Sequence, residues 1–290
     1  METHMNGLVI SAGGSKGAHS IGAIRYLLSD LKINFQIMCG VSVGAITAAF
    51  LAQFKTGQEE FAASELCKMW SKLSTKDVYV RWNPFGKWHS FWTGGFYNPA
   101  PLIKLIRENI SLDKIRQSDK QVSVGTVSLS SGKYTIFDQT SDDFIDAVIA
   151  SSLFPGMFPP IKIGNELWMD GGMKQISPID VAIRMGSDNI CAIVTSPEKR
   201  MSKFINNPTA IDSLKRAIDL STEKIMSNDI EKAQMHNKLA EHGISGYQYI
   251  GLNIIRPKYN LIEDFLDFDP EKIKKMIEIG YLDAKNQIIM

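Results

Sequence analysis

The fold of this 290-residue chain is decided by Gly40-Val-Ser42-Val-Gly44, a turn set between two apolar segments. The preceding run, Phe35–Cys39, reads as a buried strand, and Ala45–Leu51 reads as an Ala-rich helix. A G-x-S-x-G pattern between a strand and a helix is typical of a nucleophile elbow, where a serine stands on a strained turn beside residues without a Cβ. An ordinary strand-to-helix turn capped by Ser42 gives the same pattern, so this stretch alone leaves both interpretations open.

The composition is that of an ordinary globular protein, with 44% hydrophobic residues, 22% charged residues and a net charge of +1. This charge balance argues against a nucleic-acid partner. No apolar run approaches the length of a membrane span, and no signal-peptide pattern is visible. Cys39, Cys67 and Cys191 lie in apolar contexts without metal or redox spacing. We therefore expect reduced thiols, no metal or cofactor, and a cytoplasmic location, while the oligomeric state stays open.

A second glycine-rich turn lies near the N-terminus. Gly7–Ala12 reads as a strand, Gly13–Gly17 as a turn, and Ala18–Leu31 as an amphipathic helix. The backbone N–H groups of such a turn and the positive end of the helix dipole point at one spot. The turn could hold a phosphate, although the dinucleotide pattern would need glycine at Ala12. It could equally be an oxyanion hole facing Ser42, because neighbouring turns of a parallel sheet open on one edge, or it could be a plain tight turn.

The other candidate site follows a later strand. A hairpin turning at Gly164-Asn165 returns as Glu166–Met169 and delivers Asp170, which Gly171 and Gly172 follow. An aspartate in this place could act as general base to a serine. It could also cap its own turn, which is the more frequent use of Asp-Gly.

The sequence offers no obvious histidine to complete a triad with Ser42. In an α/β-hydrolase the order would be serine, then an acidic residue, then histidine. Only His236 and His242 come late enough, and both lie in a polar helical stretch. His19 comes too early, and His89 lies in an aromatic segment.

That aromatic segment, Val78–Phe96, mixes rings with basic residues, glycine and proline. Its aromatic residues are Tyr79, Trp82, Phe85, Trp88, Phe91, Trp92 and Phe96. Such a mixture suits a lipid interface or an apolar substrate mouth. A loop that packs its rings on the core would look the same. Peripheral membrane contact through this segment is therefore one of two expectations.

The remaining pattern predicts an α/β fold, a three-layer α/β/α sandwich with a mainly parallel central sheet. Further strands are expected at 121–129, 133–138, 189–195 and 247–256, and further helices at 58–73, 99–110, 142–151, 178–185, 209–242 and 270–286. The polar stretch Glu198–Asn207 is the best candidate for a boundary. We expect a catalytic domain over 5–197 and a mostly helical region with one strand over 198–290, packed on the same core.

Taken together, these motifs resemble the patatin-like phospholipase family. Ala12–Gly17 is similar to its glycine-rich motif, Gly-Gly-Gly-x-Arg/Lys-Gly, and Gly40–Ala45 is similar to its nucleophile elbow. Ala150–Pro160 resembles the loop ahead of the family's catalytic aspartate, and Asp170–Gly172 resembles its Asp-Gly-Gly/Ala motif. The resemblance spans roughly Gly7–Thr195 and keeps the family's order.

The resemblance implies a serine esterase that hydrolyses lipid acyl esters, of phospholipase A or lysophospholipase type, with a Ser–Asp dyad and an acyl-enzyme intermediate. Ser42 would be the nucleophile and Asp170 the general base. The implied oxyanion-hole residues are Ala12, Gly13, Gly14, Ser15 and Val43, and the other motif residues are Lys16, Gly17, Gly40, Gly44, Gly171 and Gly172. Ala12 departs from the family's first glycine and Val43 from its frequent alanine, but both keep a backbone N–H. A carboxylesterase or thioesterase with a histidine triad and a non-catalytic phosphate-binding module are the alternatives.

Overall fold

A computed structural model describes residues 5–83, 90–198, 209–262 and 264–288. The described residues form one eight-stranded sheet with the order β5-β6-β3-β2-β1-β7-β8, and β4 pairs with β3. The strands are β1 (Asn6–Ile10), β2 (Ile37–Val41), β3 (Gln121–Ser128), β4 (Tyr134–Asp138), β5 (Ile161–Ile163), β6 (Glu166–Asp170), β7 (Asn189–Ile193) and β8 (Gly251–Ile255). Strands β3, β2, β1, β7 and β8 run parallel, and the pairings of β4, β5 and β6 are antiparallel. The expected mainly parallel sheet is confirmed.

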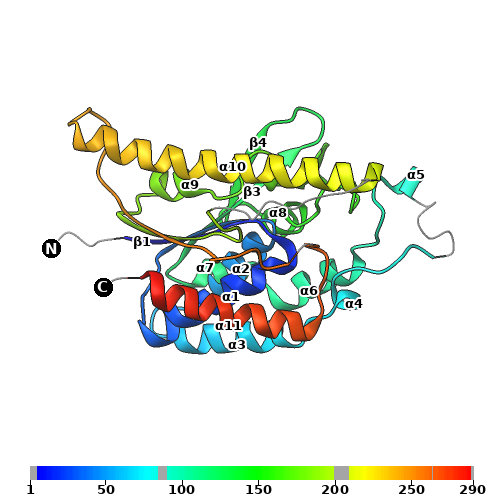
Figure 1. The fold of residues 1–290 in the computed structure, drawn as a ribbon, viewed down its shortest axis with the longest axis horizontal. Coiled ribbons are helices and arrows are strands. Elements are labelled where there is room, and N and C mark those ends of the chain that lie inside the picture. The colour runs from blue at the N-terminus through cyan, green and yellow to red at the C-terminus, as the bar shows by residue number, and fades with distance from the viewer. Residues whose placement is uncertain (1–4, 84–89, 199–208, 263, 289–290) are drawn as a thin grey trace.

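Helices cover both faces of this sheet, because its central strands bury side chains in both directions. In β1, Leu8 and Ile10 join the core on one face, and Val9 joins the core on the other. Figure 1 shows α9 and α10 on one side of the sheet and α1, α3 and α11 on the other. The helices are α1 (Gly17–Arg25), α2 (Val43–Leu51), α3 (Glu59–Ser71), α4 (Thr75–Val78), α5 (Ser90–Thr93), α6 (Ala100–Asn109), α7 (Leu112–Gln117), α8 (Phe144–Ser151), α9 (Ile179–Arg184), α10 (Ala210–Glu241) and α11 (Pro270–Gln287). The three-layer α/β/α fold is thus confirmed.

Some element ends differ from the sequence-based expectation. The helix that begins at Gly17 changes to a π-type turn over Tyr26–Asp30 before it ends. Helix α8 begins at Phe144 with Asp143 as its N-cap, two residues after the expected start, and Asp142 forms an ion pair with Arg116. Helix α10, in contrast, runs for 32 residues and agrees with the expected 209–242. Helix ends are the part of an element that apolar spacing determines least.

The region after residue 208 is built into the same layers. Strand β8 extends the sheet beside β7, α10 covers one face, and α11 packs on α1 on the other. At the α1–α11 contact, a Cβ on Gly22 would lie 1.8 Å from the carbonyl oxygen of Ile277, so the two backbones touch. The expected boundary near Glu198 adjoins residues 199–208, which lie outside the described residues, and the two-part division stays a prediction. None of the described helices is long and apolar enough to cross a membrane.

Candidate active site

Ser42 stands on a strained turn between β2 and α2. Its backbone angles are φ 59° and ψ −128°, a conformation that a residue with a Cβ rarely adopts. A Cβ on Gly40 would lie 2.1 Å from the carbonyl oxygen of Gly44, and a Cβ on Gly44 would lie 2.1 Å from that of Ile10. Both glycines are therefore required by close backbone contacts, and the turn has the geometry of a nucleophile elbow.

A buried hydroxyl holds this strained turn in place. The Ser42 N–H donates to Oγ of Ser151 over 2.8 Å, and that Oγ donates to the carbonyl oxygen of Gly125 over 2.7 Å. Ser151 is fully buried at the end of α8. Sequence analysis identified Ser151 only as part of a motif and missed this role, because no local pattern links residues 109 positions apart.

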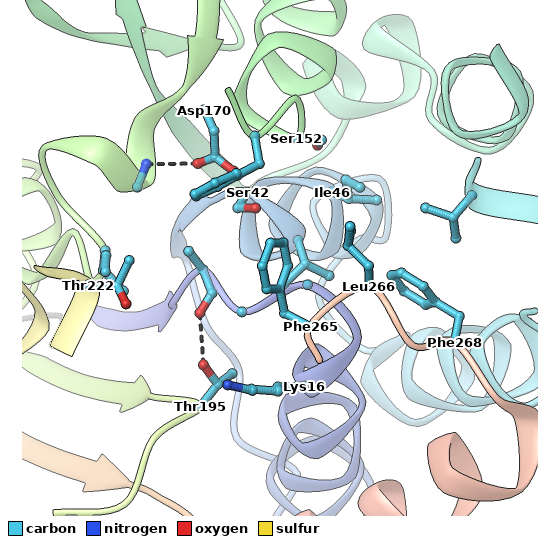
Figure 2. A pocket seen from close by; sticks show the side chains of 18 of the residues that line it. Lys16, Ser42, Ile46, Ser152, Asp170, Thr195, Thr222, Phe265, Leu266 and Phe268 are labelled. Carbon is cyan, nitrogen blue, oxygen red and sulfur yellow. Dashed lines mark hydrogen bonds between the residues drawn. The ribbon is translucent and has the colours of Figure 1, made fainter. Parts of the chain in front are cut away.

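Strand register brings Asp170 to Ser42. Val41, the last residue of β2, lies opposite Gly125 of β3, and Asp170, the last residue of β6, lies opposite the next residue, Thr126. Strand β4 occupies the other edge of β3 at both positions, so β2 and β6 share one edge. Ser42, which directly follows Val41, therefore comes beside Asp170. Figure 2 shows the two side chains next to each other on the wall of a pocket.

The Asp170 carboxyl is almost completely buried, with 1% of the residue exposed. Burial raises its pKa to about 7, and the hydrogen bond from the Gly172 amide and the neighbouring Ser42 hydroxyl limit the rise. The Gly172 N–H donates to Oδ1 over 2.7 Å. The carboxyl therefore caps its own turn, as one interpretation expected, and it also faces Ser42. Gly171 is required because a Cβ there would lie 2.3 Å from the carbonyl oxygen of Gly125.

The glycine-rich turn lies at the same sheet edge, but its N–H groups are not all directed at the pocket. The Ala12 N–H donates to the carbonyl oxygen of Ile176 over 3.1 Å, and the Ser15 N–H donates to that of Phe265 over 2.8 Å. This corrects the expectation that Ala12 and Ser15 would supply oxyanion donors, because the fold already uses both amides.

The candidate oxyanion donors are the amides of Gly13, Gly14 and Val43. Among the described residues none of these three has a hydrogen-bond partner for its N–H. Val43 is the first residue of α2, where such N–H groups have no partner within the helix. Gly17 lets α1 approach the elbow, since a Cβ there would lie 2.8 Å from Cγ2 of Val43. Lys16 lines the pocket.

The pocket around Ser42 and Asp170 holds about 1230 Å³ of empty space, its open mouth included. Its apolar wall comes from Ile46, Met69, Trp70, Leu73, Val78, Leu102, Leu105, Phe154, Phe158, Phe265, Leu266 and Phe268. Its more polar wall includes Lys16, Thr195, Ser196, Asp219 and Thr222. In Figure 2, Ile46, Leu266 and Phe268 lie on one side of Ser42, Thr222 lies on the other, and Thr195 and Lys16 lie below it. The pocket can therefore take an apolar chain on one side of Ser42 and a polar group on the other.

Residues of the C-terminal region form part of this pocket, and sequence analysis did not anticipate it. Helix α10 contributes Ile218, Thr222 and Met226, and the segment before α11 contributes Phe265 to Phe268. The rings of Phe265 and Phe154 lie with their centroids 5.3 Å apart at the pocket wall. The sequence holds no motif at these positions.

The described histidines lie away from Ser42, and none of them lines the pocket. His19 is buried, and its Nε2 lies 3.0 Å from Asp283 of α11. His236 and His242 are bound to backbone carbonyl oxygens near the end of α10. His236 lies about 15 Å along the helix axis from Met226, given the rise per residue. His89 lies outside the described residues. No group of His, Cys, Asp and Glu within the described ranges could hold a metal ion.

The aromatic segment divides between core and surface. Val78 is buried at the pocket, and Tyr79 donates its hydroxyl to the carbonyl oxygen of Leu266 over 3.1 Å. Trp82 is half-buried and donates its Nε1 hydrogen to the carbonyl oxygen of Gly95. Trp92, in contrast, is 79% exposed. Phe85, Trp88 and His89 lie outside the described residues, so among the described rings the membrane expectation rests mainly on Trp92 and less on Phe96, which is 43% exposed.

A strained serine and a buried carboxyl thus lie side by side at a largely apolar pocket. The family model described as Patatin-like phospholipase matches residues 8–183. The chain belongs to the patatin-like phospholipase family.

Similar proteins include enzymes with lipid hydrolase names. The chain is 25% identical over 262 residues to calcium-independent phospholipase A2-gamma of Rattus norvegicus, covering 79% of this chain and 32% of that protein. It is 28% identical over 263 residues to probable lipid hydrolase 463L of Invertebrate iridescent virus 6, covering 80% of this chain and 85% of that protein. The solved structure of VipD from Legionella pneumophila is similar over 98% of this chain and 67% of its own, with a TM-score of 0.47 and 13% identity. The chain spans about a third of the length of the phospholipase A2-gamma relative.

Proposed function

We propose that this protein is a lipid acyl hydrolase of phospholipase A or lysophospholipase type, with Ser42 as nucleophile and Asp170 as general base. The observation that carries the proposal is the buried Asp170 carboxyl facing the Ser42 hydroxyl at an apolar pocket. A pKa of about 7 suits a group that must take up and release a proton near neutral pH. The names of the relatives agree with this class of substrate.

The reaction runs in two steps. Oγ of Ser42 attacks the ester carbonyl carbon while its proton passes to the Asp170 carboxylate. The amides of Gly13, Gly14 and Val43 stabilise the oxyanion that forms. When the tetrahedral intermediate collapses, Asp170 gives the proton to the leaving alcohol oxygen, and the acyl group stays on Ser42. Water then loses a proton to Asp170 and attacks the acyl-enzyme, after which the fatty acid leaves and Ser42 regains its proton.

The direct test combines covalent labelling with a substrate panel. A serine-directed fluorophosphonate should label the purified protein at Ser42, and mass spectrometry should detect fatty acid released from phospholipids, lysophospholipids or simple acyl esters. The Ser42→Ala protein serves as the blank for both measurements. Absence of labelling and of hydrolysis would favour a phosphate-binding module. Loss of hydrolysis in folded His236→Ala or His242→Ala proteins would favour a histidine triad.

We further propose that Trp92 contacts the lipid surface that presents the substrate. Trp92→Ala should lower activity on phospholipid vesicles about tenfold and leave activity on a soluble short-chain ester nearly unchanged, because exposed tryptophan contributes binding energy only at an interface. Phe61→Ala, an exposed ring on α3, is the matched control and should change neither. Equal losses of Trp92→Ala on both substrates would indicate simple destabilisation and contradict the proposal.

A further inference from the structure

Asp229 of α10 is a buried carboxylate outside the part of the chain that the family model matches. The residue is 4% exposed. Its Oδ2 accepts hydrogen bonds from the Ile176 amide over 2.8 Å and from the Ser177 amide over 2.9 Å. These two residues belong to the short segment that joins Asp170 to α9. The carboxylate therefore holds the segment that directly follows the candidate base.

The same segment holds the glycine-rich turn. The carbonyl oxygen of Ile176 accepts from the Ala12 N–H over 3.1 Å, and the carbonyl oxygen of Ala12 accepts from Oγ1 of Thr195 over 2.8 Å. The second of these bonds is the dashed line at Thr195 in Figure 2. Both backbone groups of Ala12 are thus fixed directly before Gly13 and Gly14.

At its other end, the turn is held by the segment before α11. The Ser15 N–H donates to the carbonyl oxygen of Phe265, and a Cβ on Gly14 would lie 2.3 Å from that oxygen. Hydrogen bonds at Ala12 and Ser15 therefore fix both ends of the turn. The two amides between them, those of Gly13 and Gly14, are the candidate oxyanion donors.

We propose that Asp229 is a positioning residue for this oxyanion hole, acting through Ile176 and Ala12. The inference rests on the function proposed above. An oxyanion donor works when its nitrogen lies within about 2.7–3.1 Å of the developing charge, and a misplacement of about 1 Å can cost a hundredfold in rate. Loss of the Asp229 charge weakens two buried amide bonds at once, so the Ile176 carbonyl and the turn attached to it can shift.

Asp229→Asn keeps the shape of the side chain and one acceptor oxygen while removing the charge. We expect kcat to fall about 10- to 100-fold with KM within about twofold, because the oxyanion exists only in the transition state. The affinity of a trifluoromethyl ketone lipid analogue, which forms a tetrahedral adduct with Ser42, should fall by the same factor as kcat/KM. The affinity of a non-hydrolysable ether analogue should not change. Burial raises the pKa of Asp229 to about 6. The measurements should therefore be made at pH 8, where the parent carboxyl is ionised.

The matched control is Glu231→Gln on the same helix. The Glu231 side chain is largely exposed, so this substitution should leave kcat, KM and both affinities unchanged. Thermal unfolding checks that the variants keep their fold. If Asp229→Asn unfolds, Asp229→Glu replaces it, because glutamate keeps the charge but moves the acceptor oxygen by one methylene. For Asp229→Glu we again expect kcat to fall while KM stays nearly unchanged.

A readout without catalysis separates this inference from the proposed function. Hydrogen exchange measured by mass spectrometry should be faster in Asp229→Asn than in the parent for peptides covering residues 7–18 and 171–178, and Glu231→Gln should match the parent. An active parent with unchanged kinetics and exchange in Asp229→Asn would overturn the role of Asp229 alone. An inactive parent would overturn the proposed function, and the exchange result would still decide whether Asp229 holds the turn. A fall in kcat with an equal loss of ether-analogue affinity would indicate general damage and contradict a positioning role.

Discussion

Asp170→Asn should lower kcat/KM for an acyl ester by about 10³- to 10⁴-fold, and at the same time make the folded protein more stable at pH 8. The loss of activity follows because asparagine cannot accept the proton of the Ser42 hydroxyl, and general base catalysis contributes about 10²–10⁴ in rate. Asp170 is the carboxyl that faces Ser42 in the pocket, so we expect the effect at the upper end of this range. Adding Ser42→Ala should cause little further loss, because residues that act as one unit are not additive.

The gain in stability follows from the buried charge. A carboxyl whose pKa rises from about 4 to about 7 on folding costs the ionised folded state on the order of 4 kcal/mol. Between these pH values the folded protein keeps a proton that the unfolded chain has lost, so stability falls as the pH rises through this window and levels off above it. Asparagine does not ionise, and the stability advantage of Asp170→Asn should therefore be small at pH 4 and largest above pH 7.

Denaturant unfolding at pH 5 and pH 8, together with the pH profile of kcat/KM, measures both effects. In the parent, kcat/KM should rise with pH through about 7 as Asp170 loses its proton. Glu60→Gln, an exposed carboxyl in the first turn of α3, is the control and should alter neither activity nor stability. Full activity of Asp170→Asn, or a variant less stable than the parent at pH 8, would contradict the assignment.

Much of the fold was predictable because its signals are local. The strand before Ser42 is marked by its run of apolar residues. The elbow after it depends on a backbone contact between Gly40 and Gly44, which are only four positions apart, so a five-residue pattern can detect it. The signals for the paired strands expected at 121–129 and 133–138 and for the helix expected at 270–286 are local in the same sense. These elements form where the sequence places them.

The pairing of Ser42 with Asp170 could be expected only from the family resemblance. It depends on the register of β2 and β6 along one edge of β3, and no pattern within either strand encodes that register. The use of the Ala12 and Ser15 amides was also not predictable. Their partners, Ile176 and Phe265, are more than 160 positions away, so the number of oxyanion donors can be counted only in the folded chain.

Gly280→Ala should destabilise the protein by about 3 kcal/mol or more, although alanine in place of a helical glycine normally stabilises by up to about 1 kcal/mol. A Cβ on Gly280 would lie 1.9 Å from the carbonyl oxygen of His19, and a Cβ on Gly22 would lie 1.8 Å from that of Ile277. Both obstacles are backbone atoms, so no side chain can turn away, and α11 must move from α1 as a whole. That movement would break the 3.0 Å contact between His19 and Asp283.

Denaturant unfolding of Gly280→Ala, Gly22→Ala and the double variant tests this contact. Lys275→Ala, an exposed substitution on α11, is the control and should change the free energy of unfolding by less than about 0.5 kcal/mol. The two glycine variants should be less than additive, because one displacement of α11 relieves both clashes. The glycine variants should also have lower hydrolytic activity, because α11 directly follows the segment whose Phe265 and Phe268 line the pocket. Stabilisation by either alanine would mean that α1 and α11 do not touch as described, and that the C-terminal region folds apart from the sheet that carries Ser42.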